Sequence, residues 1–144
     1  MLSLTCKAAV KAVLFLASRY EAGEKSGIAA LSEAIEENPH TVGKLMQTLV
    51  GAGVINSIKG PGGGFYITKE QLKQPVITIV DAVDGKEVFR ACALGLRKCS
   101  ASHPCPMHHE YKKGRDAIEN LFRKTRIRDL SEQVASGAVY LSNA

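Results

Sequence analysis

The sequence lacks the features of membrane, secreted and repeat proteins. Its longest apolar stretch, residues 8–17, is interrupted by Lys11 and is too short for a membrane span, and no secretory signal pattern opens the chain. Cysteine is scarce, with 4 in 144 residues, which is below the density of a secreted disulfide scaffold. No internal repeat or low-complexity segment is present. We therefore expect a cytoplasmic protein without a membrane-embedded part.

Length and charge favour one compact domain but do not identify a partner. A chain of 144 residues with 45% hydrophobic residues can fill one core. The net charge of +5 suits an anionic partner. The excess is spread unevenly, however, because residues 1–70 carry 7 basic and 6 acidic side chains, whereas residues 71–144 carry 12 and 8. A nucleic-acid interface must therefore be inferred from particular residues rather than from the net charge.

Apolar periodicity predicts three helices in the first 52 residues. The first should span residues 3–22 and end at Gly23, and the second should follow a Ser26 cap and carry Ile28, Leu31 and Ile35. Asn38-Pro39 should start the third, which runs to about residue 52, because Asn caps helices and Pro suits their first position. One face of this third helix is apolar (Val42, Leu45, Met46 and Leu49), and the other carries His40, Thr41, Lys44, Gln47 and Thr48.

Two short β-prone runs follow, at residues 54–59 and 65–68, joined by Gly60-Pro61-Gly62-Gly63-Gly64. Three helices and a glycine-tipped hairpin are the parts of a winged helix-turn-helix, in which the third helix enters the DNA major groove and the wing approaches phosphates or the minor groove. A nucleotide phosphate loop is disfavoured, because the glycine run lacks a Lys-Ser/Thr ending and does not lead into a helix. The alternative for the polar helix face is an ordinary solvated surface. We predict DNA contacts from that face and from Lys59, Gly60, Pro61, Gly62 and Gly63.

The second part of the chain should hold a short helix, a cysteine-bearing loop and a long helix. The short helix should run from Pro75 to near Gly85, and the loop from about residue 89 to 106. Residues 107–124 should form the long helix, with an apolar stripe of Tyr111, Ile118, Leu121, Phe122 and Thr125. That stripe is too long for a 70-residue wing domain to cover, so we expect it at a homodimer interface. Residues 131–138 should form a last short helix or turn.

These expectations define the fold class and the domain organisation. The chain should be mainly α with a small β-hairpin, that is, a winged helix-turn-helix followed by a long dimerisation helix. Residues 1–74 should be the DNA-binding domain. Residues 75–144 should hold the cysteine loop, as a metal or cluster site, and the dimerisation helix.

Three cysteines and one histidine have the spacing C-x6-C-x5-C-x2-H, formed by Cys92, Cys99, Cys105 and His108. Gly95, Pro104 and Pro106 make this segment an irregular loop, so its side chains can converge on one metal centre. The neighbouring Arg90, Arg97 and Lys98 favour thiolate over thiol. A tetrahedral zinc site and an iron–sulfur cluster both suit these ligands, and His109 permits a second zinc-like spacing. Cysteines without a ligand are a further alternative.

An enzyme is not predicted. A thiol oxidoreductase would be the enzyme class closest to these cysteines, but the chain has neither a C-x-x-C pair nor a surrounding βαβ pattern. The cysteines therefore point to binding or sensing rather than to catalysis.

The motifs together resemble the IscR/NsrR/CymR-type family of winged helix-turn-helix transcriptional regulators, in its iron–sulfur-binding branch. The resemblance covers about residues 1–130 and rests on the glycine-rich wing at residues 57–65, the preceding helix end at 49–54, the segment 79–85 and the segment 92–108. It implies a homodimeric regulator that binds a roughly palindromic operator in double-stranded DNA. It also implies an iron–sulfur cluster that modulates this binding in response to redox state, nitric oxide or cluster supply.

The resemblance also assigns residues. By position, Cys92, Cys99 and Cys105 match the family's cluster cysteines, and His108 matches the histidine that IscR-like members use as the fourth ligand. His40, Lys44 and Lys59 match DNA-contacting positions.

The chain departs from the family pattern at two places. Its first cysteine spacer has six residues where IscR has five, and Lys7 stands where some relatives carry an acidic cluster ligand. His108 is therefore the better candidate for the fourth ligand, with His103 and His109 as alternatives, and an imidazole ligand favours a 2Fe-2S cluster. Cys6 lies on an apolar helix face and is expected in the core. The alternative function is a cluster-free regulator of the same fold, whose cysteines act as thiol switches or hold zinc.

Overall fold

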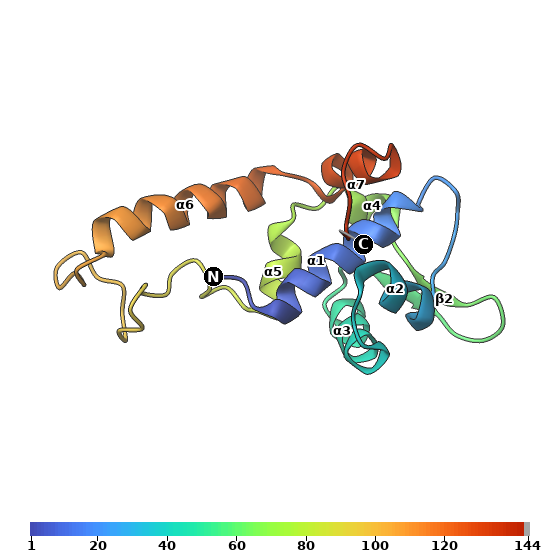
Figure 1. Cartoon of the computed structure of the whole chain (residues 1–144), viewed down its shortest axis with the longest axis horizontal. Helices are drawn as coiled ribbons and strands as arrows, with labels where there is room; N and C mark the ends of the chain where they lie inside the picture. Colours follow the sequence, from blue (N-terminus) through green and yellow to red (C-terminus); the bar gives the residue numbers. More distant parts are fainter. Residues whose placement is uncertain (143–144) are drawn as a thin grey trace.

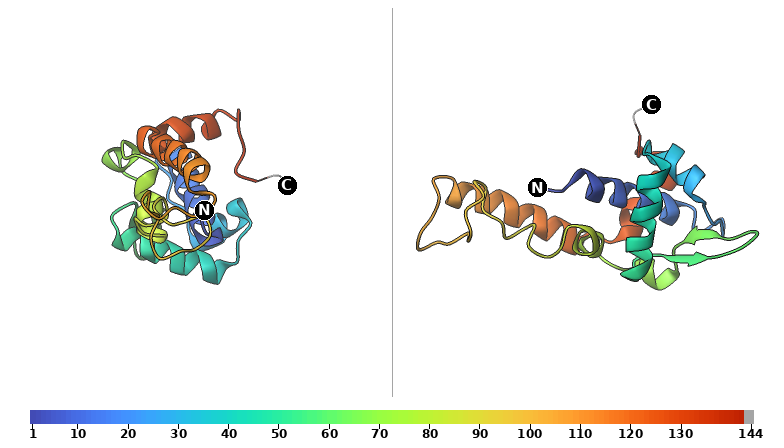
Figure 2. Two further views of the ribbon diagram at one scale, coloured as in Figure 1. Left: turned by 90° about the vertical axis from the view of Figure 1, so that its left-hand side faces the viewer. Right: turned by 90° about the horizontal axis from the view of Figure 1, so that it is seen from below.

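The chain folds into a helical body joined to a long arm (Figure 1), as seen in a computed structural model that describes residues 1–142. The body contains α1 (Leu4–Ser18), α2 (Ile28–Ile35), α3 (Pro39–Gly51), α4 (Lys69–Leu72), α5 (Ile77–Val83) and α7 (Ile127–Ala135). A hairpin of β1 (Asn56–Ile58) and β2 (Gly64–Tyr66) connects α3 to α4. The arm consists of α6 (His108–Lys124) and the irregular loop before it, which run side by side in both views of Figure 2. The predicted fold class is confirmed.

α1 begins where the sequence predicts and ends earlier. The Ser3 hydroxyl accepts a hydrogen bond from the amide of Cys6 at 3.0 Å and so caps the helix. The helix stops at Ser18 rather than near residue 22, because residues 19–23 turn through short-range bonds, such as the one from the Arg19 amide to the Leu16 carbonyl. Gly23 adopts a φ of 67° at the end of this turn.

The predicted Ser26 cap of α2 is wrong. Gly27 occupies the capping position and makes no side-chain bond. Ser26 instead pairs with Phe65 of β2, and the two residues exchange backbone hydrogen bonds of 3.0 and 2.8 Å. The segment before α2 therefore extends the wing hairpin rather than capping the helix.

α3 has the predicted boundaries and faces. The Asn38 side chain accepts a hydrogen bond from the His40 amide at 2.8 Å, and Pro39 occupies the first helical position. The predicted apolar residues are all buried (Val42, Leu45, Met46 and Leu49). Because these residues fix the helix on the core, its polar side is left outward.

The wing hairpin depends on glycine. β1 and β2 pair antiparallel, with Ser57 opposite Phe65. Gly60, Gly62 and Gly64 all have positive φ values of 74–145°. A Cβ on Gly63 would lie 2.2 Å from the carbonyl oxygen of Ile58, which is backbone and cannot give way. The turn therefore requires glycine where the sequence places it.

One core joins both halves of the chain. α1 packs against α2, α3, α5 and α7. The same buried cluster holds Leu16 and Leu49 from the first half and Ile79 and Ile127 from the second. The predicted division at residue 74/75 therefore does not separate two cores. That the two parts differ in function stays a prediction. No helix in the described range 1–142 is long and apolar enough to cross a bilayer.

α7 begins at Ile127, earlier than the predicted residue 131. Ile127 is 0% exposed, and its amide donates to the Gln74 carbonyl at 3.0 Å. The Asp129 carboxylate also accepts a hydrogen bond from the Arg126 amide, which satisfies a donor at the helix start. A contact with a distant segment therefore fixes this boundary.

Candidate functional site

The outward face of α3 carries the five predicted DNA-contacting side chains. His40, Lys44, Gln47 and Thr48 are exposed. Thr41 is half-buried. It lines a hollow of about 320 Å³ together with Thr5 of α1 and Val83 of α5. The Thr48 hydroxyl donates to the Lys44 carbonyl at 3.2 Å. The structure thus brings the predicted hydrogen-bonding groups together on one helix surface.

The wing presents the second set of predicted DNA-contacting residues. Lys59, Gly60, Pro61 and Gly62 are exposed at its tip, and Gly63 is half-buried by the turn itself. Phe65, which is 8% exposed, anchors the hairpin on the core. In Figure 1 the wing extends from the end of the body opposite to the arm. The hairpin therefore protrudes from the body, and its base is packed on the core through Phe65.

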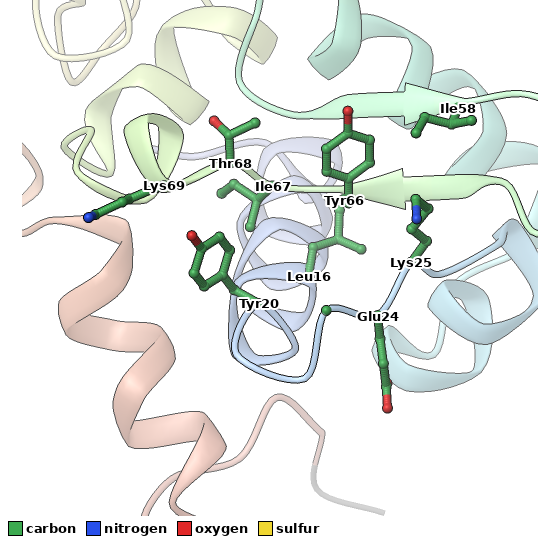
Figure 3. A pocket seen from close by; sticks show the side chains of 10 residues that line it. Leu16, Tyr20, Glu24, Lys25, Ile58, Tyr66, Ile67, Thr68 and Lys69 are labelled. Atoms are coloured by element: carbon green, nitrogen blue, oxygen red, sulfur yellow. The ribbon is translucent and has the colours of Figure 1, made fainter.

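A hollow of about 440 Å³ beneath the wing was not predicted. Figure 3 shows its lining, which comes from residues 16–25, from Ile58 of β1 and from residues 66–69, at the end of β2 and the start of α4. Tyr20 and Tyr66 contribute their rings, and the ammonium of Lys25 lies 5.9 Å from the centre of the Tyr66 ring. Lys69 also lines it and is exposed. Three separate segments form the hollow, so the sequence gives no local signal for it.

The predicted metal ligands lie in the arm, and two of them are in contact. Cys99 Sγ is 3.2 Å from His108 Nδ1, at the first residue of α6. The pKa of the Cys92 thiol is lowered, chiefly by the backbone amide of Leu94, which donates to its sulfur at 3.4 Å, and next by that of Leu96. The Cys105 thiol makes a smaller contribution to the same lowering of the pKa. His108 and Cys105 are buried, at 5% and 8% exposure.

The donor set and the space around it fit a metal cluster, although the four residues are not closed into one site. Across residues 1–142, no group of three His, Cys, Asp or Glu side chains is arranged to hold a metal ion. Cys92 and Cys99 nevertheless line one hollow of about 440 Å³, and its charged lining consists of the three cations Arg90, Arg97 and Lys98 and one acid, Glu87. Soft thiol donors around a cationic space suit an anionic iron–sulfur centre.

Of the three histidines near the cysteines, His108 is the one that contacts a thiol. His109 is exposed, and its ring packs edge-on against that of His108, with ring centres 5.1 Å apart. His103 is exposed, and its Nδ1 lies 3.4 Å from the Ser102 hydroxyl. The geometry therefore favours His108 over the two alternatives.

Sequence reasoning missed Arg115. This α6 residue is 5% exposed and donates to Cys99 Sγ at 3.2 Å. Many residues of α6 are charged, so the residue type of Arg115 does not single it out in the sequence. Its position could have done so, because seven residues after His108 the helix returns to the same face.

The arm leaves part of its apolar stripe outward. Ile118 is 38% exposed and Leu121 is 47% exposed. Phe122 turns inward and packs edge-on against Phe89, with ring centres 5.7 Å apart. The stripe therefore has one side against the chain's own loop and one side on the surface, and its role as a dimer interface stays a prediction.

Known proteins share both sequence and fold with this chain. Residues 2–133 match the Rrf2 family, described as an iron-dependent transcriptional regulator. A protein of Aquifex aeolicus named as an HTH-type transcriptional regulator is 36% identical over 89 residues. That match covers 60% of this chain and 62% of the relative, so the chain matches less than two thirds of the relative's length.

Two solved structures have the same fold. CymR, the global cysteine regulator of B. subtilis, matches with a TM-score of 0.75 and 17% identity, over 92% of this chain and 96% of CymR. T. potens IscR matches with a TM-score of 0.70 and 15% identity, over 96% of this chain and 91% of IscR. At such identities the likeness establishes the winged helix-turn-helix architecture.

Proposed function

The chain belongs to the Rrf2 family of transcriptional regulators, and from this premise we propose that it is a homodimer whose operator affinity is modulated by an iron–sulfur cluster. The operator is a roughly palindromic site in double-stranded DNA. The cluster is of the 2Fe-2S type and is held by Cys92, Cys99, Cys105 and His108. The observation that carries this proposal is the contact of 3.2 Å between Cys99 Sγ and His108 Nδ1 beside a hollow lined by two thiols and three cations.

Each part of the arm has a chemical role in this proposal. A bound cluster supplies a centre that responds to redox state, nitric oxide or cluster supply. Three thiolates around such a centre leave excess negative charge, which Arg90, Arg97 and Lys98 offset at the edge of the hollow. His108 holds its ligand nitrogen at the start of α6 and so ties the loop to that helix.

Packed side chains connect the loop to the DNA-binding helix. Phe89 stands three residues before Cys92 and contacts Phe122 of α6. It also belongs to a buried cluster with Ile77 and Val80 of α5. α5 in turn packs against α3. A change in the loop therefore has a continuous packed route to the helix that we propose for the major groove.

The DNA contacts follow from the exposed surfaces of the body. His40, Thr41, Lys44, Gln47 and Thr48 present donors and acceptors that suit base edges and phosphates. Lys59 and the Gly60–Gly63 tip contact the backbone or the minor groove. Bare glycine backbone permits the close approach that a phosphate contact needs.

Anaerobic purification tests the cluster directly. We expect a coloured protein with visible absorption and with iron and sulfide in equal amounts, and operator affinity that changes when the cluster is removed. Cys105→Ala should abolish the colour, whereas Cys6→Ala, in the core, should keep it. A colourless protein without iron after anaerobic reconstitution would refute the cluster assignment.

The second candidate is a cluster-free regulator of the same fold. It is favoured because the candidate ligands Cys92, Cys99, Cys105 and His108 are not arranged as one closed metal site within residues 1–142, although Cys99 contacts His108. The likeness to CymR, named as a cysteine regulator, also supports it. In this case the thiols act as a switch or hold zinc. The same metal analysis distinguishes the two, because zinc or bare thiols give a colourless protein.

A further inference from the structure

Arg115 places a positive charge inside the arm. Its side chain is 6% exposed. The carboxylate of the neighbouring Asp116 lies 3.8 Å from its Nε, beyond hydrogen-bond range, and is itself bonded to Lys112. Nε has no hydrogen-bond acceptor among the described residues. Burying a charge is costly unless other groups compensate it, so the contacts of this guanidinium need an explanation.

Those contacts converge on the ends of the first cysteine spacer. Nη1 of Arg115 donates to the Ala91 carbonyl at 2.9 Å and to Cys99 Sγ at 3.2 Å. Ala91 directly precedes Cys92, so one nitrogen atom holds the backbone at the start of the six-residue spacer and the thiol at its end. The guanidinium therefore closes this loop at a single point.

Cys99 is held by α6 from two positions. His108 and Arg115 lie seven residues apart, which is two turns on the same face and about 10 Å along the helix axis. The long Arg115 side chain spans this distance, so its Nη1 and the Nδ1 of His108 are both 3.2 Å from one sulfur. The loop is thereby attached to α6 by the contacts of Cys99, in addition to the peptide backbone that leads from the loop into the helix.

We propose that Arg115 is a positioning residue that closes the Cys92–Cys99 loop onto α6 and donates an N–H···S hydrogen bond to the Cys99 sulfur when this sulfur ligates the cluster. The inference rests on the proposed cluster function. The ligating sulfur carries negative charge, which compensates the buried guanidinium. A hydrogen bond to a ligating sulfur withdraws electron density and stabilises the more reduced state of the centre. Arg115 thus raises the reduction potential and connects it to the helix proposed for dimerisation.

Substitution of Arg115 tests this with two readouts. Arg115→Gln removes the charge and Arg115→Lys keeps it without the planar fork. Arg123→Gln is the matched control, since Arg123 is an exposed arginine of the same helix, paired with Glu119. Reduction potentials of the reconstituted proteins are measured by redox titration. Amide hydrogen exchange of Leu94 and Gly95, which donate to Cys92, is measured in the cluster-free proteins.

We expect the potential of Arg115→Gln to shift to a more negative value and that of Arg115→Lys to lie between Arg115→Gln and the parent. Exchange of the two amides should become several-fold faster in Arg115→Gln, and Arg123→Gln should match the parent in both measurements. An unchanged potential in a folded Arg115→Gln protein overturns the hydrogen bond to the ligating sulfur. If the parent takes up no cluster, the proposed function fails. The exchange data then decide the loop closure separately, and unchanged exchange refutes it.

Discussion

Cys6 is chemically distinct from the other three cysteines. It is 0% exposed and packs with Ile77, Val80 and Phe89. Burial is the main cause that raises the pKa of its thiol from 9.0 to about 12, and the negative charge of Asp84 adds to it. A thiol that stays neutral at physiological pH is a poor nucleophile and a poor metal ligand. The expectation that Cys6 lies in the core is confirmed.

The raised pKa of Cys6 predicts an alkaline loss of stability. The folded state favours the neutral thiol, so this stabilisation is complete below pH 9, where the unfolded thiol is also neutral. It is lost as the pH rises from 9 toward 12, because the unfolded thiol ionises first. At pH 10.5 we expect a loss on the order of 1 to 2 kcal/mol from this group alone.

Urea unfolding at pH 8 and pH 10.5 measures this loss. Cys6→Ala is the control, since it lacks the thiol but keeps every other titrating group. The free energy of unfolding should fall more between the two pH values for the parent than for Cys6→Ala. Equal falls would contradict the assignment of a raised pKa to Cys6.

The fourth ligand is decided among three histidines. His108→Ala should lose the parental absorption spectrum of the reconstituted cluster, because its Nδ1 already lies against the Cys99 thiol. His103→Ala and His109→Ala should keep it, since both side chains are exposed. His108→Cys should give a more persistent cluster with a lower reduction potential, because a thiolate donates more electron density than an imidazole. The assignment fails if His108→Ala alone keeps the parental spectrum.

At the scale of the element, α3 is the helix whose side chains should determine operator affinity. Lys44 is exposed at the centre of its polar face. Lys44→Ala should weaken operator binding by about 1 to 3 kcal/mol if Lys44 contacts a base. If it contacts a phosphate instead, the loss should be uniform across sequences and the salt dependence should fall by about one charge.

Binding titrations at several salt concentrations separate these outcomes. Lys112→Ala provides the control, because Lys112 is exposed on the arm, away from α3. Unchanged affinity together with an unchanged salt slope in Lys44→Ala would show that this face does not bind DNA.

The wing makes a second prediction for a single element. Gly63→Ala places a Cβ within 2.2 Å of the Ile58 carbonyl oxygen, so the turn must change its backbone path, at a cost on the order of 1 to 3 kcal/mol. We expect reduced operator affinity with little loss of helix content by circular dichroism. Gly27→Ala, before α2, has a φ of −84° and its added Cβ would meet no atom within 4 Å, so it should bind the operator like the parent. Full affinity in Gly63→Ala would show that the wing shape is unimportant for binding.

The elements also show what a sequence can and cannot specify. α3 was predictable because its start depends on the adjacent Asn38 and Pro39 and its faces on helical periodicity. The wing turn was predictable because glycine conformations are local. Ser26, in contrast, bonds to Phe65, and Ile127 bonds to Gln74, so distant partners decide these boundaries. The Arg115 contact with Cys99 crosses 16 residues and depends on how the loop lies on α6. The four candidate metal ligands could be named from their spacing, whereas the contact between Cys99 and His108 could not.

At the scale of the whole molecule, the wing and the arm lie at opposite ends of the body (Figure 1). The cysteine loop is thus remote from the wing, so the proposed effect of the loop on DNA binding must pass through the body or through the proposed dimer. α6 begins at His108 and presents Ile118 and Leu121 on its surface. If two copies pair through α6, a change at its first residue, His108, shifts this helix in both subunits. Such a shift would change the distance between the two α3 helices.

Dimerisation through α6 is tested by Leu121→Asp. Leu121 is 47% exposed in the single chain, so the substitution leaves the monomer core intact. In the dimer it would bury a carboxylate without a partner, which costs several kcal/mol. Sedimentation should show a dimeric parent and a folded monomeric variant. Asn120→Asp, at an exposed polar position one residue away, adds the same charge and should remain dimeric.

The operator should report the same change in assembly. A dimer presents two α3 helices to one face of the DNA, so the parent should protect two half-sites about one helical turn apart, roughly 10 base pairs. Leu121→Asp should lose this paired footprint and bind a half-site only weakly, because the second contact no longer adds to the first. A Leu121→Asp protein that stays dimeric and keeps the paired footprint would place the subunit interface elsewhere on the molecule. A parent that protects one isolated half-site would indicate a monomeric regulator.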